Sequence, residues 1–380
     1  MEWKEVRLGE ISSKIGDGLH GTPKYDDEGP YYFINGNNLN CGKIIIKDDT
    51  KRVGKDEFVK NQKELNEQTI LVSINGTIGN VAKYNNELCI LGKSACYINV
   101  IKEVDKEFIY YVLTSANFKR NITNEATGTT IKNVSLKQMR EYKFNIPCNI
   151  SDQRHIASIL SSLDRKIELN NKINADLEEM AQAIFKNWFV DFEPFKDGKF
   201  VDSELGMIPE GWKVGTLEDL ITIKYGKDHK KLEDGTFPVY GSGGFMRFVN
   251  SWLYDGESVL IPRKGTLDNI MYVCEKFWTV DTMFFSVPKM DYVMKYVYNY
   301  IKRFDFSKMN EGTSVPSNTA ARLNKMPILI PTHEILEMYD ETLCPVYNKR
   351  KMKDKESRTL SLLRDTLLPR LMSGELEIPE

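Results

Sequence analysis

The stretch IASILSSLDRKIELNNKINADLEEMAQAIFKNW, residues 156–188, decides how the rest of the chain is arranged. Its apolar residues recur at alternating spacings of four and three, which is typical of a long helix that packs along another helix. A helix of about 38 residues would be roughly 57 Å long at 1.5 Å per residue. Two asparagines interrupt the apolar stripe near its middle. The stripe consists of Ile156, Leu160, Leu163, Ile167, Asn170, Asn174, Leu177, Ala181, Ile184 and Trp188.

A second stripe in the last part of the chain, 183 positions further on, predicts the partner helix. It is again apolar at both ends and polar in the middle, so the two helices most simply pack on each other. If they hold modules at opposite ends, the pair is antiparallel and the chain has a pseudo-twofold axis. The polar centre either fixes the register or marks a wider, hydrated stretch, and Pro345 predicts a kink or a late start. The second stripe consists of Tyr339, Leu343, Val346, Arg350, Lys353, Ser357, Leu360, Arg364, Leu367 and Leu371.

The duplication extends beyond the two helices. The sequence NGTIGN at 75–80 returns as KGTLDN at 264–269, an offset of 189. Trp3 matches Trp212 at an offset of 209, and Pro147 matches Pro331 at an offset of 184. Because the offset falls steadily along the chain, the second copy is shorter, and the losses are expected in loops. Two copies with different interiors predict one task performed on two different targets.

Each copy contains short runs rich in Ile, Val and Tyr and bounded by Gly and Asn, which are typical of strands. Examples are PYYFIN, KIIIK, TILVSI and CYINVI in the first copy and FPVYG, SVLIP and MFFSV in the second. A helix is predicted after Asp105 and another after Asp291. The fold class is therefore α+β, with two duplicated mixed α/β modules joined by two long antiparallel helices that form a coiled coil. The predicted borders are 1–150 for the first module, 151–190 for the first long helix, 191–330 for a linker and the second module, and 331–380 for the second long helix.

The composition narrows the classes of function. With a formal net charge of −2 the 380-residue chain does not fit a nonspecific nucleic-acid coat, although a specific reader can still gather Lys and Arg on one face. No apolar run approaches the roughly 20 residues of a membrane span, and the start MEWKEVRLGE is not a signal peptide. Six cysteines without a C-x-x-C pair predict free thiols in the cytoplasm and no metal site.

Enzyme motifs give no support to a catalytic function. GDGLHG at 16–21 fits the glycine pattern of dinucleotide sites, but Pro23 and Pro30 follow it and no helix can start there to hold a phosphate. The sequence lacks a P-loop, the Asn-Pro-Pro-aromatic tetrapeptide of amino-methyltransferases and the nucleophile elbow of hydrolases. We therefore predict a chain with no catalytic residue and no cofactor of its own.

Loops rich in amide, hydroxyl and basic groups lie between the predicted strands. Arg and Lys suit guanine edges and phosphates, and Asn suits adenine. Solvated turns would have a similar composition, but the repeated placement on a repeated scaffold favours a binding surface. The candidate DNA contacts of the first copy are Asp17, His20, Thr22, Lys24, Asn35, Asn37, Asn38, Asn75, Thr77, Thr129, Thr130 and Lys132. Those of the second copy are Lys227, His229, Lys230, Ser242, Arg263, Lys264, Thr266 and Ser314.

Over its full length the chain resembles the DNA-specificity subunits of type I restriction–modification systems. The resemblance is carried by DGLHGTPKY at 17–25, LVSINGTIGNVA at 71–82, GTTIKNVSLKQMREYKFNIP at 128–147, the long helix that begins with DQRHIASIL at 152–160, and the ending LLRDTLLPRLMSGELEI at 362–378. One departure is Asp152 before Gln153, where the family usually has Glu-Gln, and the second copy lacks this pair.

The resemblance implies that each module is a target-recognition domain reading one half of a bipartite, asymmetric DNA site. It implies that the helices space the halves and dock two modification subunits, which bring S-adenosylmethionine and methylate adenine. Two motor-nuclease subunits would add cleavage that depends on ATP and Mg²⁺. Two other hypotheses stay open: a self-contained DNA-modifying enzyme, and a coiled-coil adaptor without a role on DNA.

Overall fold

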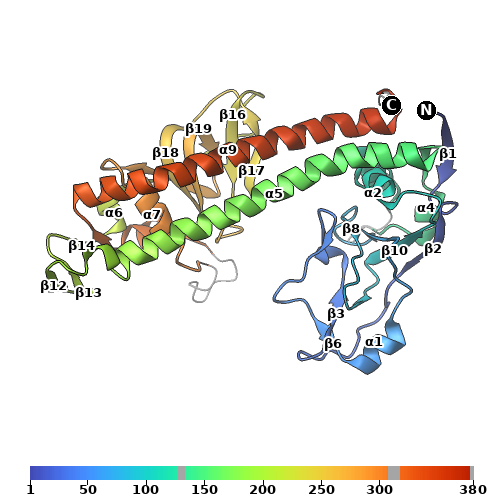
Figure 1. The fold of residues 1–380 in the computed structure, drawn as a ribbon, viewed down its shortest axis with the longest axis horizontal. Helices are drawn as coiled ribbons and strands as arrows, with labels where there is room; N and C mark the ends of the chain where they lie inside the picture. Colours follow the sequence, from blue (N-terminus) through green and yellow to red (C-terminus); the bar gives the residue numbers. More distant parts are fainter. Residues whose placement is uncertain (127–132, 307–316, 377–380) are drawn as a thin grey trace. The chain divides into compact units, whose positions relative to one another are not determined.

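The computed structural model describes residues 1–126, 133–306 and 317–376 (Figure 1). The chain divides into two compact units. Unit 1 contains Met1–Asn170 and Lys355–Glu380, and unit 2 contains Asn171–Asp354. Each unit therefore holds one globular module together with half of each long helix. The predicted fold class, with a duplicated mixed module and a long antiparallel helix pair, is confirmed.

The two long helices are α5 (Ile150–Phe189) and α9 (His333–Met372). Contacts across the pair join Asp164 to Arg364 (2.8 Å), Asn170 to Ser357 (3.3 Å), Asn174 to Asp354 (2.6 Å) and Glu178 to Arg350. The residue number rises along α5 while that of its partner falls along α9, so the helices are antiparallel within each unit. The asparagine amides of α5 bond directly across the pair, which favours their predicted part in fixing the register.

Pro345 neither delays nor ends the second helix, because α9 begins at His333. The predicted late start is therefore wrong. A proline inside a helix removes one backbone hydrogen bond and crowds the preceding turn. Here Leu343, Val346 and Tyr347 on either side of it are buried in the core of unit 2. Tertiary packing of this kind, more than intrinsic propensity, keeps a helix formed.

The module of unit 1 is built around an antiparallel sheet in the order β2-β10-β7-β8. A three-stranded sheet β6-β3-β9 lies beside it, and β1 pairs with β11. The strands are β1 Trp3–Arg7, β2 Ser12–Asp17, β3 Tyr31–Ile34, β4 Leu39–Asn40, β5 Lys43–Ile44, β6 Arg52–Val53, β7 Thr69–Ser73, β8 Val81–Lys83, β9 Cys89–Leu91, β10 Ala95–Val100 and β11 Lys143–Pro147. The helices are η1 Gly36–Asn38, α1 Lys55–Asn61, α2 Lys106–Thr114, α3 Ala116–Glu125 and α4 Leu136–Glu141.

The module of unit 2 repeats this topology in one six-stranded sheet, β15-β20-β18-β19-β16-β17, and β14 pairs with β21 as β1 does with β11. The strands are β14 Lys213–Thr216, β15 Ile221–Tyr225, β16 Phe237–Gly241, β17 Gly244–Val249, β18 Tyr254–Pro262, β19 Met271–Thr279, β20 Met283–Pro288 and β21 Pro327–Ile330. The helices are α6 Leu217–Leu220, α7 Met294–Ile301 and α8 Ala320–Asn324. The first part of the stretch expected to hold a linker and the second module contains η2 Glu193–Phe195 and the hairpin β12 Phe200–Ser203 with β13 Gly206–Pro209.

One strand explains why the second copy has a single sheet. The unbroken β19 pairs with β18 along most of its length and then runs parallel to β16. In the first copy the corresponding stretch is divided into β8 and β9, and Asn86 between them has a left-handed backbone (φ 61°). Asparagine tolerates this conformation better than most residues. The same pairings are therefore kept, but the first module splits them over two sheets.

A similar polar triad joins each module to both long helices. In unit 1 the hydroxyl of Tyr111 on α2 donates to Asp164 on α5 (2.7 Å), which also accepts from Arg364 on α9. In unit 2 the hydroxyl of Tyr298 on α7 donates to Glu178 on α5 (2.9 Å), which pairs with Arg350 on α9. Burial, followed by the hydrogen bond to the Asp164 carboxylate, raises the pKa of Tyr111, so this phenol stays a donor.

No helix in the described ranges is both long enough and apolar enough to cross a membrane.

In unit 2, α7 carries a buried lysine against the helix pair. Lys295 is 4% exposed and its ammonium contacts Asp340 on α9 (2.7 Å) and Glu257 on β18 (3.1 Å). A buried charge of this kind is tolerated only while its partners remain.

We predict that Lys295→Ala lowers the free energy of unfolding of unit 2 by about 3 kcal/mol, because it leaves two carboxylates beside the core without their cation. Four of the five tryptophans, Trp188, Trp212, Trp252 and Trp278, lie in unit 2, so denaturant unfolding followed by tryptophan fluorescence reports mainly on that unit. Lys276→Ala is the matched control. It breaks an exposed pair with Asp255 (3.7 Å), and we expect a loss below about 1 kcal/mol. Equal losses in the two variants would contradict the prediction.

Candidate nucleic-acid interface

The predicted polar loops of the first module meet at one edge of its sheets. In the antiparallel sheet Asp17 lies opposite Cys96, and Ala95 lies opposite Ser73. The parallel pairing of Ile34 with Leu91 brings the end of β3 to the same side. Backbone hydrogen bonds from Leu19 to Leu91 and from Lys93 to Leu19 tie these loops together. We call the four loops 17–24, 35–38, 74–80 and 92–94 the first loop edge.

The loop after β2 begins with a contact between an imidazole and a carboxylate. Nε2 of His20 lies 2.7 Å from Oδ2 of Asp17, and the histidine side chain is 71% exposed. Thr22 and Lys24 further along the loop are also exposed. The loop therefore offers a hydroxyl, an ammonium and an imidazole to a ligand. Asp17 supports His20 here, and its own oxygen is occupied by that contact.

The three asparagines that follow β3 differ in their exposure and in their hydrogen bonds. Asn37 is exposed. Asn35 is half-buried and accepts a hydrogen bond from the hydroxyl of Ser94 (2.9 Å). Asn38 is 4% exposed, and its amide donates to the carbonyl of Ile45 (3.0 Å) and to Thr50 (3.2 Å). We therefore correct the expectation for Asn38 and assign it to the folding of its own loop, because its burial and its bonds leave no group for a ligand.

The loops 74–80 and 263–270, which contain the repeated Gly-Thr pair and are called the G-T loops, occupy the same place in both modules. Gly76 and Gly265 have left-handed backbones, with φ of 74° and 87°, which glycine adopts at no steric cost. Each loop is bridged to the segment just before a later helix, through Asn75 with Asn133 before α4 and through Lys264 with Ser317 before α8. Thr77 and Thr266 follow the glycines and are exposed. The duplicated phrase thus builds a duplicated loop at the same edge of each sheet.

The second module forms the second loop edge from loops 226–231, 242–243, 263–270 and 280–282. The backbone N–H of Lys227 donates to Thr279 (2.8 Å), and that of Arg263 donates to Thr282 (2.8 Å). The amide of Asn269 donates to the carbonyl of Ser242 (2.9 Å), which joins the turn after β16 to the G-T loop. Ser242 is therefore placed beside the loop that carries Lys264.

Cations dominate the second loop edge. Lys227, Lys230 and Lys264 are exposed. Between the first two lies Asp228, whose Oδ1 accepts from the backbone N–H of Lys230 (3.1 Å), and this bond holds the pKa of Asp228 below its usual range. His229 is half-buried because Nε of Arg247 contacts its Nδ1 (3.3 Å). The loop 226–231 is thus anchored by its histidine and presents its lysines.

The structure adds residues that composition did not reveal. Tyr225, at the end of β15, is 55% exposed, and the guanidinium of Arg263 lies 5.6 Å from its ring centroid. This cation–π contact and a bond from Arg263 to the carbonyl of Asp281 (3.5 Å) hold the arginine at the edge. Tyr225 could have been found from its place in KYGKDHKK. Four candidates, Thr129, Thr130, Lys132 and Ser314, lie outside the described residues.

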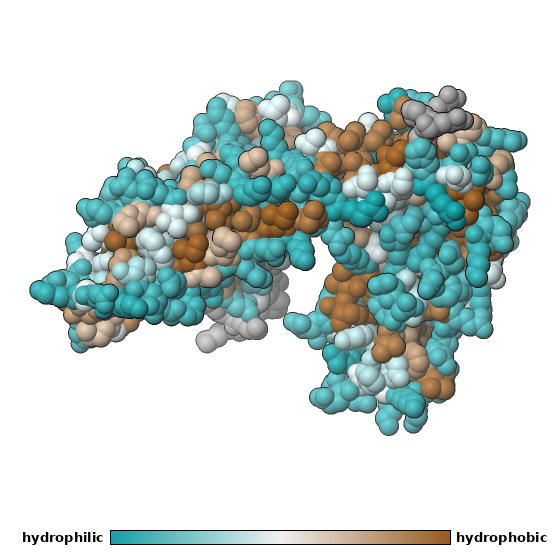
Figure 2. Space-filling model, viewed as in Figure 1, coloured by the Kyte–Doolittle hydropathy of each residue, from teal (hydrophilic) through white to brown (hydrophobic). Residues whose placement is uncertain are grey.

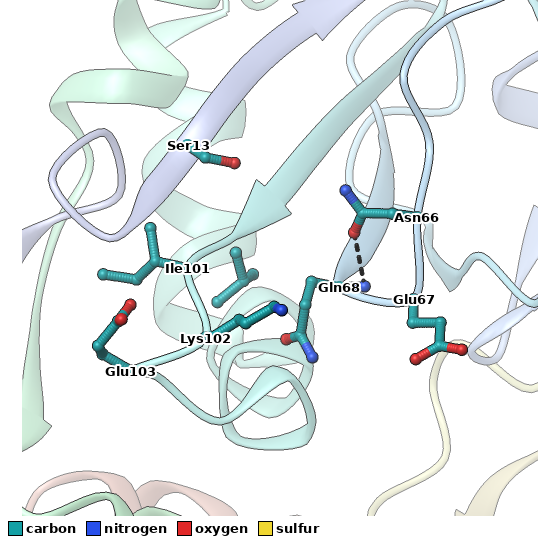
Figure 3. A pocket seen from close by; sticks show the side chains of 8 residues that line it. Ser13, Asn66, Glu67, Gln68, Ile101, Lys102 and Glu103 are labelled. Atoms are coloured by element: carbon teal, nitrogen blue, oxygen red, sulfur yellow. Dashed lines mark hydrogen bonds between the residues drawn. The ribbon is translucent and has the colours of Figure 1, made fainter.

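A cavity of about 580 Å³ lies at the opposite edge of the first module's sheet (Figure 3). It opens between the start of β2 at Ser13, the end of β10 at Val100 and the residues before β7. Its charged lining is mixed and consists of Lys102, Glu67 and Glu103. No candidate residue lines it, and within the described ranges no cluster of His, Cys, Asp and Glu could hold a metal ion.

Comparison with known proteins gives a consistent result. A family described as "Type I restriction modification DNA specificity domain" matches residues 1–179 and 209–353, which include both modules. The MjaIX type I restriction enzyme specificity subunit of Methanocaldococcus jannaschii is 26% identical over 398 residues, covering 94% of this chain and 87% of that protein. A putative type I specificity subunit of Mycoplasma pneumoniae is 32% identical over 251 residues, which cover 62% of this chain and 65% of that protein. The crystal structure of a type I restriction–modification S subunit from M. genitalium covers all of this chain and 97% of its own, with a TM-score of 0.57 at 21% identity.

Proposed function

The chain belongs to the type I restriction–modification DNA specificity family, and from that premise we propose that it selects the DNA sequence on which a modification and restriction complex acts. Each loop edge reads one half of a bipartite, asymmetric site in double-stranded DNA. The long helices set the gap between the halves. The chain itself is not an enzyme; it positions partners that carry the chemistry.

One observation carries this proposal: the same loop edge is built twice from the same topology, with different side chains. The first edge offers His20, Asn37 and Thr77, while the second offers Lys227, Arg263 and Lys264. Buried strands hold both sets of side chains in place, so the loops can differ in sequence while the strands that carry them stay the same. Two readers of this kind suit two unequal half-sites. Arginine and lysine recognise guanine and phosphate, and asparagine recognises adenine.

The partners are proposed from chemistry that this chain lacks. Two modification subunits would bring S-adenosylmethionine for adenine methylation, and two motor-nuclease subunits would bring ATP and Mg²⁺. The long helices offer exposed apolar side chains for such docking. Leu169 and Met180 on α5 are 50% and 51% exposed, and Leu362 on α9 is 70% exposed. Figure 2 shows apolar side chains along parts of both helices, and exposed apolar patches of this kind mark protein interaction sites.

The first test selects the target directly. We expect the chain assembled with its modification subunits to enrich two separated sequence blocks from a pool of random duplexes. A triple variant, Lys227→Ala with Arg263→Ala and Lys264→Ala, should lose the block read by unit 2 and keep the other. Enrichment of one continuous block, or of none, would contradict the proposal. So would the loss of both blocks in the triple variant.

The second test separates base contact from phosphate contact. Arg263 is held by Tyr225 and Asp281, so we expect Arg263→Ala to cost roughly 1–3 kcal/mol on the selected site and far less on other sequences. Lys264→Ala should weaken binding evenly and lower the salt slope by about one. Lys213→Ala, an exposed lysine on β14 away from the loop edge, is the control. Unchanged affinity and salt slope in both variants would remove the G-T loop from the interface.

The third test lengthens the helix pair. Asn174 contacts Asp354, so heptads inserted after Ala175 and after Met352 face each other and keep the register. Each heptad adds roughly 10.5 Å, about 3 base pairs at about 3.4 Å each. That step also turns the second half-site by roughly 100°. We expect the same two blocks, a preferred gap longer by about one to three base pairs and weaker binding, because short DNA resists twisting.

A heptad in α5 alone is the control, since it displaces Asn174 and its neighbours from their partners on α9 and should impair folding. The gap is read from the selected duplexes. If the doubly extended chain kept the original gap, the helices would not set the spacing.

A further inference from the structure

Beside the second loop edge, strand β17 presents three exposed apolar side chains. Phe245, Met246 and Phe248 are 42%, 51% and 40% exposed. The rings of Phe245 and Phe248 are 4.8 Å apart between centroids, so they form one surface. β17 is the last strand in the sheet order. An exposed apolar edge strand invites aggregation unless something covers it in the working protein.

A bulge turns part of this surface toward the loop edge. Tyr240 pairs with Phe245 and Val239 pairs with Arg247, so Met246 is an extra residue without a facing partner in the ladder. Bulges of this kind redirect a side chain and are frequent beside functional sites. The sulfur of Met246 lies close to Gly241, where an added Cβ would come within 2.7 Å of it. Met246 therefore lies over the turn 241–244 that ends the hairpin.

The turn is continuous with the proposed DNA surface. Ser242 within it accepts from Asn269 of the G-T loop (2.9 Å), and its hydroxyl lies where a Cβ on Gly265 would come within 2.5 Å. The turn 241–244 thus connects the apolar surface with the G-T loop that carries Arg263 and Lys264. On β17 itself Arg247 anchors the lysine-bearing loop 226–231, with Nη2 donating to the carbonyl of His229 (2.7 Å).

The cations that flank the apolar surface indicate whether a protein or DNA covers it. The centre of a protein–protein interface is depleted of charged residues, whereas proteins that press apolar side chains against bases flank them with Arg and Lys. We propose that Phe245 and Met246 make an apolar contact with the bases of the half-site read by unit 2. The contacted surface is a thymine methyl group or the face of a base that the hairpin unstacks. This inference rests on the proposed function and adds specificity residues to it.

The contact is expected only in unit 2. In the first module the segment after β3 is η1, followed by the two-residue strand β4, and it is built from Gly36, Asn37 and Asn38. The amide of Asn38 is bonded within its own loop, and the exposed group of this segment is the amide of Asn37. The two half-sites would therefore be read by different chemistry, one through amides and hydroxyls and one through cations with an apolar contact.

The test uses the complex with modification subunits and the bipartite site that the wild-type complex selects. We expect Phe245→Ala to weaken binding about tenfold, the scale of one base–aromatic contact, and Met246→Ala to weaken it less, both with an unchanged salt slope. Phe245→Leu should recover most of the affinity. Met207→Ala removes a similarly exposed methionine (56%) on β13 and should have no effect. Melting temperatures of all variants exclude loss of the fold.

Two probes with the wild-type protein identify the base surface. Uracil in place of a single thymine removes only the methyl group, and 2-aminopurine brightens when its base is unstacked. A loss of affinity in the first or a signal in the second, confined to the half-site of unit 2 and lost in Phe245→Ala, supports the contact. Silence of both probes overturns the proposal. So does a Phe245→Ala variant that assembles poorly with modification subunits but whose assembled complex binds the selected site with wild-type affinity. A wild-type complex that selects no bipartite site would instead overturn the proposed function.

Discussion

The polar triad that joins a module tyrosine, an acid on α5 and an arginine on α9 is the interaction on which the two units depend. It consists of Tyr111, Asp164 and Arg364 in unit 1 and of Tyr298, Glu178 and Arg350 in unit 2. Each triad orders residues that are far apart in the chain, because α5 and α9 are separated by a whole module. Partly buried groups of opposite charge contribute only while every member is present. The triads therefore fix the face that each module presents to the helix pair, and with it the direction of the loop edge.

The period of the long helices could be predicted from the sequence, but their buried faces could not. The heptad stripe of a two-helix pair predicts that Ile184 and Trp188 are buried. In the structure these two are only partly buried, whereas Phe185 and Phe189 are almost fully buried. The reason is α7, which adds a third surface and draws the buried face toward Ala181, Phe185 and Phe189, spaced by four. The KIIIK run shows the same limit. Only Lys43 and Ile44 form β5, and Ile45 and Ile46 are each 38% exposed, because no neighbouring strand continues the ladder.

The kinds of side chain in the candidate site could be predicted from the sequence, but which of them are exposed to a ligand could not. Among the described residues, the polar loops chosen from the sequence meet at the two loop edges, and their contact with DNA stays a prediction. Asn37 and Asn38 are adjacent in sequence and chemically identical, yet one is exposed and the other is enclosed by its own loop. Tyr225, Phe245 and Met246 were missed for the opposite reason, because aromatic and apolar residues in a strand are ordinarily core. Only the end of β15 and the bulge in β17 show that these three are exposed.

A nearly neutral chain can still read DNA tightly if two weak readers are tethered. In the proposed function, once one loop edge has bound, the second would meet its half-site at an effective concentration set by the connection, and affinity would grow without any new contact. Neither edge then needs the broad basic surface of a nonspecific binder. Without that surface, the sequence-independent share of the affinity falls, and the ratio between right and wrong sites rises. In the proposed function, the formal net charge of −2 favours discrimination between sites, and the connection through the long helices would keep the second reader within reach of its half-site.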